Sequence, residues 1–192
     1  MKLHPTTLPG VLIAEPAVFA DERGWFTESF NEARFNAAVQ ALGLPTPPRF
    51  VQDNHSCSVA GVLRGLHYQL PPHAQGKLVR VVQGSAFDVA VDITAGSPTF
   101  GQWFGIELSA TNQRQLWIPP GFAHGFLALS PDTHFLYKTT DVYARDCERS
   151  IRYDDPAIGI PWPAVAGVQS LLVAPKDAAA PLLAQADLPA AA

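Results

Sequence analysis

Beyond residue 50 the chain consists of short runs of alternating apolar and polar residues, separated by turn-forming residues. Many short runs at near-even spacing, with little helix between them, are typical of a β-sandwich or β-barrel. The pattern predicts strands over residues 50–58, 62–69, 78–83, 87–93, 103–108, 115–118, 122–129, 134–139 and 150–153. Glycine and proline punctuate these runs, so we expect an all-β fold with tight turns.

One segment has helical periodicity instead. Its apolar residues recur at helical spacing between residues 32 and 42, which predicts a short helix there. Asn31 is a suitable N-cap and Gly43 a suitable residue just after the last turn. Pro45 prevents the helix from continuing.

Length and composition predict one domain spanning residues 1–192. A chain of 192 residues can bury a substantial core, and its hydrophobic content of 47% fits a globular protein. We expect the core to occupy about residues 11–177. The remaining residues, about 178–192, are rich in Ala, Pro and Leu, and we expect a small helical or loose C-terminal segment.

Charge and cysteine content narrow the partners and the compartment. A net charge of −4 argues against a nucleic-acid polymer as partner but permits a small anion held by a few arginines. Cys57 and Cys147 give no disulfide framework, which favours a reducing compartment. Neither a signal-peptide core nor a run of about 18 apolar residues is present, so we expect a cytoplasmic protein without a membrane partner.

His67 and Lys77 are the first candidates for chemistry. Strand alternation places both on inward-facing positions of neighbouring predicted strands, and it places Arg64 on the face opposite His67. A base and a cation beside one cavity suit proton abstraction next to a carbonyl, with histidine taking the proton and lysine stabilising the enolate oxygen. Alternation also directs Val89 toward the core and Asp88 to the opposite side.

Nine motifs together resemble the dTDP-4-dehydrorhamnose 3,5-epimerase family. The similarity runs from about Val11 to the Lys176–Asp177 pair. Its segments are DERG (21–24), FVQDNHS (50–56), LRGLHYQ (63–69), QGKLVR (75–80), FDVAVD (87–92), SPTFG (97–101), WIP (117–119), GFAHGF (121–126) and FLYK (135–138).

The resemblance implies a cupin-type jelly-roll β-barrel or sandwich, and a homodimer. It implies conversion of dTDP-4-dehydro-6-deoxy-D-glucose (dTDP-4-keto-6-deoxy-D-glucose) to dTDP-4-dehydro-L-rhamnose by inversion at C3 and C5, with no cofactor. The product would feed dTDP-L-rhamnose synthesis for surface polysaccharide or lipopolysaccharide. Some related enzymes invert only one of the two carbons, and no residue of this sequence decides between these outcomes.

The resemblance also implies catalytic roles for four residues. His67 matches the base, and Asp177 matches the aspartate that pairs with it. Tyr137 matches an acid acting from the opposite sugar face, and Lys77 matches the group beside the C4 oxygen. Taken without the motifs, each has a plainer interpretation, such as a core histidine, a solvated tail aspartate, a core tyrosine or a surface lysine.

Further positions match the family's substrate-binding residues. Arginine suits a diphosphate because its planar fork donates two parallel hydrogen bonds. In the family, the segment carrying Arg23 and Glu28 reaches the partner's site. The substrate-binding positions implied are Arg23, Glu28, Gln52, Asn54, Arg64, His124, Tyr143, Glu148 and Lys176.

Other classes of function fit less well. A metal-dependent cupin needs several closely spaced ligands, but Tyr68 and Gln69 follow His67, so there is no His-x-His pair and we expect no metal site. A non-catalytic sugar-nucleotide-binding cupin would not need His67, Lys77 and Tyr137 together. The sequence also lacks a Gly-x-Ser-x-Gly elbow, a P-loop and a dinucleotide fingerprint.

Overall fold

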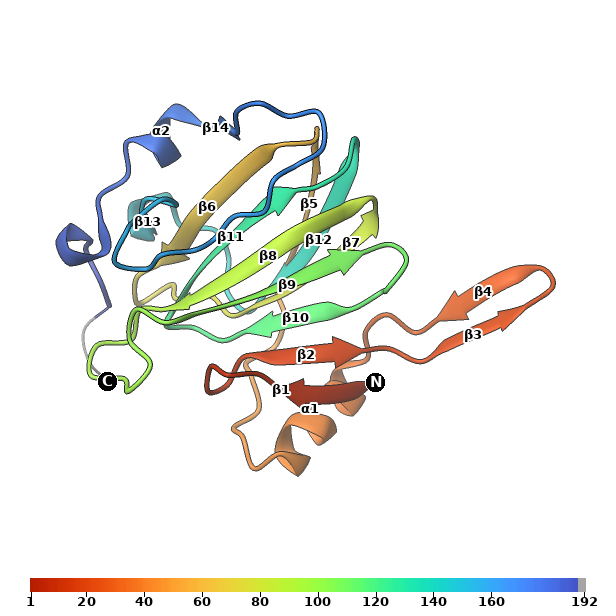
Figure 1. The fold of residues 1–192 in the computed structure, drawn as a ribbon. Coiled ribbons are helices and arrows are strands. Elements are labelled where there is room, and N and C mark those ends of the chain that lie inside the picture. Colours follow the sequence, from red (N-terminus) through yellow and green to blue (C-terminus); the bar gives the residue numbers. More distant parts are fainter. Residues whose placement is uncertain (190–192) are drawn as a thin grey trace.

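Two sheets packed face to face form the body of the protein in the computed structural model, which describes residues 1–189 (Figure 1). Sheet I has the strand order β1 (Lys2–Pro5), β2 (Leu12–Glu15), β10 (Gln115–Ile118), β7 (Lys77–Gln83), β12 (Thr133–Thr139) and β5 (Gln52–Ser58). Sheet II has the order β13 (Glu148–Ser150), β6 (Val62–Gln69), β11 (Phe122–Ala128), β8 (Ser85–Asp92) and β9 (Trp103–Ser109), and β14 (Leu172–Val173) pairs with β6. This all-β sandwich is the predicted jelly-roll architecture.

Apolar side chains from both sheets meet between them. Sheet I contributes residues such as Val79 and Phe135, and sheet II contributes residues such as Ala90 and Phe126. The rings of Phe126 and Phe135 stack with their centroids 4.1 Å apart. Alternate positions on each strand therefore face the interior, as the period of two in the sequence predicts.

The outer face of sheet I is covered by α1 (Glu32–Ala41). Phe35, on the apolar stripe of this helix, packs against Trp117 of β10. The Asn31 side chain accepts a hydrogen bond from the Arg34 backbone, and Gly43 follows the C-cap with a φ of +73°. The predicted helix and both of its boundary residues are thus confirmed.

The outer face of sheet II is covered by the C-terminal part of the chain. Val89 and Val91 of β8 pack there against Ile151, Ile158 and Leu183. Strand β8 is thus covered on both faces, and five of the seven residues 87–93 are apolar.

The C-terminal segment is more ordered than the loose tail considered above. It contains α2 (Pro175–Ala178) and a 3₁₀ helix at Leu183–Gln185, and Ala180 and Leu183 are buried. The last residues of the expected tail, 190–192, lie outside the described residues.

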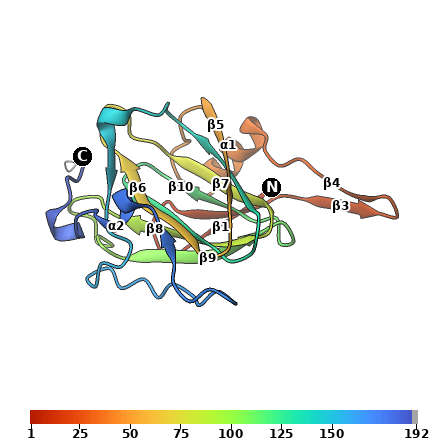
Figure 2. The same cartoon turned by 90° about the horizontal axis from the view of Figure 1, so that it is seen from above.

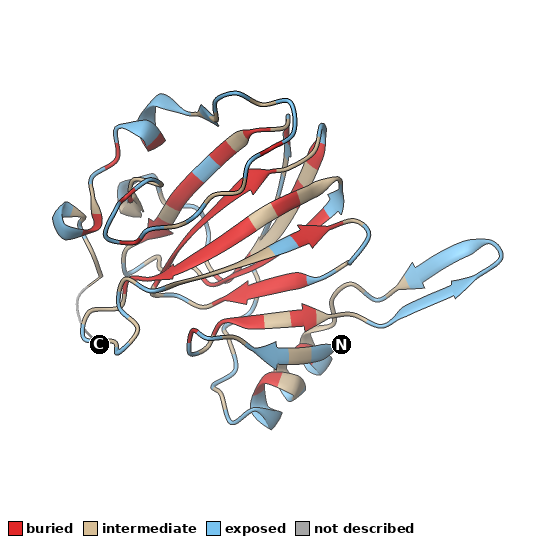
Figure 3. Ribbon diagram, viewed as in Figure 1, coloured by how far each residue is buried: buried red, intermediate tan, exposed pale blue. Residues whose placement is uncertain are grey.

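A two-stranded hairpin extends away from the sandwich (Figures 1 and 2). It consists of β3 (Val18–Asp21) and β4 (Gly24–Thr27), which pair only with each other. Figure 3 shows the hairpin as exposed, and Phe19, Trp25 and Phe26 are 64%, 62% and 68% exposed. The sequence pattern did not predict it because neither strand has a buried face.

Two predictions about strands were wrong. The strand predicted at 150–153 is β13, which ends at Ser150, after which Ile151 exchanges two backbone hydrogen bonds with Leu66. The alternation predicted for β6 also fails. His124 lies opposite His67 while Phe126 lies opposite Arg64, so β6 contains one extra residue between these pairs.

This bulge turns Arg64 and His67 toward the same cavity. Gly65 makes the bulge possible, because its φ is +132° and a Cβ there would lie 2.5 Å from the Cα of Gly125. No side chain can be accommodated at such a close approach of two strands.

Candidate active site

A cavity lies between the two sheets at one end of the sandwich. It consists of two adjoining hollows of about 140 and 330 Å³, and both are lined by Asn54, His67, Lys77, Tyr137 and Glu148. Three of these residues come from sheet I and two from sheet II. The cavity therefore has two chemically different walls.

His67 and Lys77 were predicted on neighbouring strands, and this is wrong. Strands β6 and β7 are consecutive in sequence but belong to facing sheets. The two residues still meet, because Lys77 reaches across and its Nζ donates a hydrogen bond to the His67 carbonyl oxygen over 3.2 Å.

His67 is held by Asp177, which lies on α2 at the edge of β6. His67 Nε2 is 2.8 Å from Asp177 Oδ1, and Asp177 Oδ2 accepts a hydrogen bond from the Gly65 backbone at 3.2 Å. Burial acts to raise the pKa of Asp177, but the hydrogen bonds from His67 and Gly65 outweigh it and hold this pKa below its ordinary value. The ionised carboxylate can only accept, so Nε2 carries a proton and Nδ1 is free to act as a base.

Lys77 is almost completely enclosed. Its exposed fraction is 8%, and burial lowers the pKa of Lys77 to about 8, with the carboxylates of Asp88 and Glu148 limiting the fall. An ammonium group with little solvent around it interacts strongly with any negative charge that develops nearby.

A second histidine–aspartate pair lies on the same wall as His67. His124 Nε2 is 2.7 Å from Asp88 Oδ1, and Asp88 is fully buried. The other oxygen, Oδ2, is a buried side-chain atom without a hydrogen-bond partner among the described residues. Burial lowers the pKa of His124 in spite of the opposing effect of Asp88, so the ring is neutral at pH 7.

Asp88, which is bonded to His124, was not among the site residues predicted from the sequence. Alternation correctly placed it on the side of β8 opposite Val89, but that side faces the interior between the sheets. The available signal was the presence of two carboxylates, Asp88 and Asp92, in the otherwise apolar FDVAVD segment. A buried aspartate needs a partner, and His124 on the adjacent strand β11, two residues from the Phe126 that pairs with Asp88, supplies one.

Tyr137 stands on the sheet I wall, across from His67. Burial raises the pKa of Tyr137, with Glu148 adding to the rise and Arg64 opposing it. The phenol therefore keeps its proton at neutral pH and can donate it.

Polar residues that bond to one another form the rim of the cavity. Glu148 is bonded to Lys176 Nζ at 3.2 Å and to Tyr143 Oη at 3.0 Å, and Gln52 donates to Asn54 at 3.0 Å. Burial acts to raise the pKa of Glu148, but these two bonds hold it below its ordinary value. Such a rim suits a ligand with several polar groups.

The structure places ten of the predicted site residues around this cavity, and Asp177 lies directly behind His67. Arg23 and Glu28 lie elsewhere. Arg23 is at the tip of the hairpin and pairs with Asp21 at 2.6 Å, while Glu28 pairs with Arg34 at 2.9 Å near the start of α1. Within one chain they do not line the cavity.

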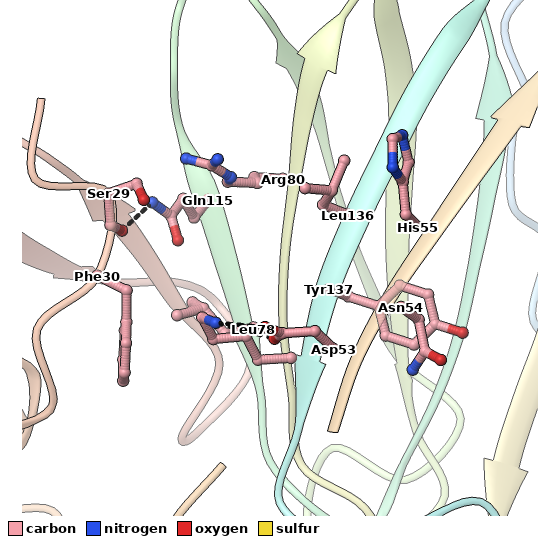
Figure 4. A pocket seen from close by; sticks show the side chains of 11 residues that line it. Ser29, Phe30, Asp53, Asn54, His55, Leu78, Arg80, Gln115, Leu136 and Tyr137 are labelled. Atoms are coloured by element: carbon pink, nitrogen blue, oxygen red, sulfur yellow. Dashed lines mark hydrogen bonds and ion pairs between the residues drawn. The ribbon is translucent and has the colours of Figure 1, made fainter. Parts of the chain in front are cut away.

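A separate cavity of about 300 Å³ lies on the other side of sheet I, near the base of the hairpin (Figure 4). Arg80, Gln115 and Leu136 line it, and the Asp53 carboxylate there is bonded to Lys138 at 2.8 Å. Among the described residues that line this cavity there is no histidine–carboxylate pair comparable to that of His67, so we place the chemistry between the sheets.

Within residues 1–189, no cluster of three or more His, Cys, Asp or Glu side chains is arranged to hold a metal ion. In the same range, no helix is long and apolar enough to cross a membrane.

Comparison with known proteins gives one consistent result. A sequence model of the dTDP-4-dehydrorhamnose 3,5-epimerase family matches residues 5–185. A curated protein of that name from Shigella flexneri is 56% identical over 177 residues, which cover 92% of this chain and 93% of the relative.

Solved structures agree with the sequence match. An epimerase from Legionella pneumophila in complex with dTDP-4-keto-L-rhamnose superposes with a TM-score of 0.89 at 50% identity, covering 98% of this chain and 97% of that chain. A 3′-monoepimerase from Streptomyces bikiniensis in complex with dTDP-quinovose gives a TM-score of 0.85 at 35% identity, covering 97% and 92%.

The buried ammonium of Lys77 predicts a characteristic pH dependence of stability. Between the folded pKa of about 8 and the ordinary value of 10.5, the unfolded chain binds more protons than the folded one, so stability rises with pH. Lys77→Met lacks this titration. We expect it to exceed the parent in unfolding free energy at pH 7 by roughly 2 kcal/mol, an advantage that shrinks from pH 8 upward. Urea denaturation of both proteins at pH 7 to 10 measures this difference in unfolding free energy. A difference that does not change with pH would contradict the lowered pKa of Lys77.

Proposed function

This chain belongs to the dTDP-4-dehydrorhamnose 3,5-epimerase family, and from that premise we propose how the cavity between its sheets performs the reaction. The enzyme is an isomerase that inverts C3 and C5 of dTDP-4-dehydro-6-deoxy-D-glucose, giving dTDP-4-dehydro-L-rhamnose for dTDP-L-rhamnose synthesis. The observation that carries the proposed mechanism is the placement of His67, backed by Asp177, and Tyr137 on facing walls of one cavity.

His67 is the base in this proposal. The protons at C3 and C5 are acidic because both carbons adjoin the C4 ketone, and Nδ1 is the free ring nitrogen that can remove them. The imidazolium that forms is stabilised by the ionised carboxylate of Asp177, which also fixes the tautomer.

Lys77 stabilises the enolate. Its ammonium group is buried beside His67, where a donor placed at the C4 oxygen typically contributes about 2.7–4 kcal/mol. His124, whose Nε2 faces Asp88, presents Nδ1 as a hydrogen-bond acceptor for a sugar hydroxyl. No redox cofactor enters this scheme, because inversion leaves every carbon at its original oxidation state.

Tyr137 completes the inversion. Removing and returning a proton from the same side would restore the original configuration, so a second group must act from the other face. The protonated phenol on the sheet I wall is placed to do this, because the planar enolate would lie between it and His67.

The rim and Arg64 bind the remainder of the substrate. Arg64 faces the cavity from the bulge in β6, and its fork suits the diphosphate. Lys176 adds a second cation, and Gln52, Asn54, Tyr143 and Glu148 offer hydrogen bonds to the nucleotide and sugar. The two free cysteines accord with a reducing compartment, which supports a cytoplasmic location.

A homodimer would bring Arg23 and Glu28 to a substrate. Both lie on or beside the projecting hairpin, whose aromatic side chains are exposed in the single chain. Exposed aromatic residues on a protruding element are typical of interfaces. In the proposed dimer the hairpin covers the partner's cavity and adds these two side chains to it.

Single-carbon epimerisation is the alternative within the family, since one structural relative is a 3′-monoepimerase. A binding module without catalysis is the alternative outside it. The His67–Asp177 pair disfavours the second, because binding alone does not require an oriented base beside a buried ammonium.

Solvent exchange distinguishes these functions. In deuterated water, proton NMR of dTDP-4-keto-6-deoxy-D-glucose with the enzyme should show loss of the C3 and C5 proton signals. His67→Asn should slow both exchanges by about 10²–10⁴-fold, whereas His4→Asn, an exposed histidine on β1, should change neither. Exchange at one carbon only would indicate a monoepimerase. Nucleotide binding without exchange would contradict the catalytic proposal.

Subunit mixing tests the proposed dimer. Arg23→Ala and His67→Asn should each be nearly inactive alone. If Arg23 acts in the partner's site, half of the randomly mixed dimers contain one intact site, and activity should recover to about a quarter of the parent value. Activity that stays at the mean of the two separate variants would show that Arg23 does not act across the dimer.

A further inference from the structure

The short helix that carries Asp177 has little of its own to hold it in place. Helix α2 has four residues, and the element before it, β14, pairs with β6 through only Leu172 and Val173. A single helical turn has no intrinsic stability in water. Apart from the bonds of Asp177 to Gly65 and His67 and of Lys176 to Glu148, the position of α2 depends on the segments on either side of it, β14 before it and the chain that follows it.

That following chain, residues 179–189, is anchored along the outer face of sheet II; we call it the strap. The Arg152 backbone donates to the Pro181 carbonyl at 2.9 Å. The Leu183 backbone donates to Asp155 Oδ2 at 2.6 Å, and Asp155 is 3% exposed. The Leu183 side chain packs into the cluster that also contains Tyr68.

Tyr68 holds the far end of the strap. It follows His67 in β6 and points to the outer face, where its Oη donates to the Asp187 carbonyl oxygen at 2.6 Å. Burial raises the pKa of Tyr68 to about 12, so the hydroxyl remains a donor at all working pH values. The Asp187 carboxylate accepts a second bond from Arg149 Nε at 2.8 Å.

One strand thus contacts both ends of the C-terminal segment. Gly65 and His67 of β6 bond to Asp177, and the adjacent Tyr68 bonds to Asp187. We propose that the strap is a positioning element for catalysis, in which Tyr68 and Asp187 fasten it to β6 and thereby hold the Asp177 carboxylate on His67. This inference rests on the role proposed above for the His67–Asp177 pair.

The effect on rate follows from geometry. A shift of about 1 Å in a positioning group can lower a rate by up to roughly 10²-fold, because the base is then wrongly oriented in the transition state. Tyr68 borders one hollow of the cavity, but its ring packs in the outer cluster and its hydroxyl bonds to Asp187, so in this proposal both residues act through α2.

A double-mutant cycle tests the proposal on the full-length chain. Tyr68→Phe/Asp187→Ala removes both fastening bonds and keeps the buried ring. We expect this variant to lower kcat about three- to tenfold, because the loss of one or two hydrogen bonds weakens the placement of Asp177 on His67. Asp177→Asn alone should lower kcat far more. If the strap acts through Asp177, adding the two strap substitutions to Asp177→Asn should change kcat by less than about twofold.

Val39→Ala is the matched control, because it weakens the packing of α1 on sheet I, on the opposite side of the sandwich. It should lower Tm without changing kcat below the unfolding transition. Equal losses of kcat from the strap substitutions in the parent and in the Asp177→Asn background would overturn the proposal, as would unchanged kcat in the Tyr68→Phe/Asp187→Ala variant. Full kcat in Asp177→Asn would instead overturn the role proposed for the His67–Asp177 pair.

Discussion

The hydrogen bond between His67 and Asp177 joins residues 110 positions apart, and much of the fold serves to make it. The bulge at Gly65 turns His67 into the cavity and leaves the Gly65 N–H at the edge of β6 to bond Asp177. Strand β14, helix α2 and the strap bring the carboxylate to that edge. Without the carboxylate, His67 would lack a fixed tautomer and a partner for the charge it acquires.

The sandwich also explains why inversion is feasible at a single site. Sheet II carries the base His67, whereas sheet I carries Tyr137 and Lys77, so a flat enolate held between the sheets meets different groups on its two faces. This arrangement has a cost in stability. It keeps the Lys77 ammonium and the Asp88 carboxylate almost free of solvent, where charges are unfavourable unless they are paired.

Local sequence was sufficient to predict the elements that bury one face, because burial gives these elements a regular spacing of apolar residues. Helix α1 was predicted because Phe35 and its apolar neighbours follow the helical period. The central strands were predicted because residues such as Phe135 follow the strand period of two. The position of Arg64 could not be predicted, because a bulge depends on how β6 pairs with β11. Likewise, the sequence pattern could not show that His67 and Lys77 face each other from different sheets, because this depends on how the strands are connected. Motif resemblance, rather than periodicity, identified Asp177 and Tyr137.

The most direct test of the two-wall mechanism is to measure deuterium incorporation and stereochemical inversion together in Tyr137→Phe. In the parent enzyme, each deuterium that enters at C5 should accompany an inverted centre. In Tyr137→Phe, His67 should still remove the proton, so exchange should continue with the original configuration retained while formation of the inverted product falls about 10²–10⁴-fold. Inversion that keeps pace with exchange in this variant would contradict the assignment of acid and base to opposite walls.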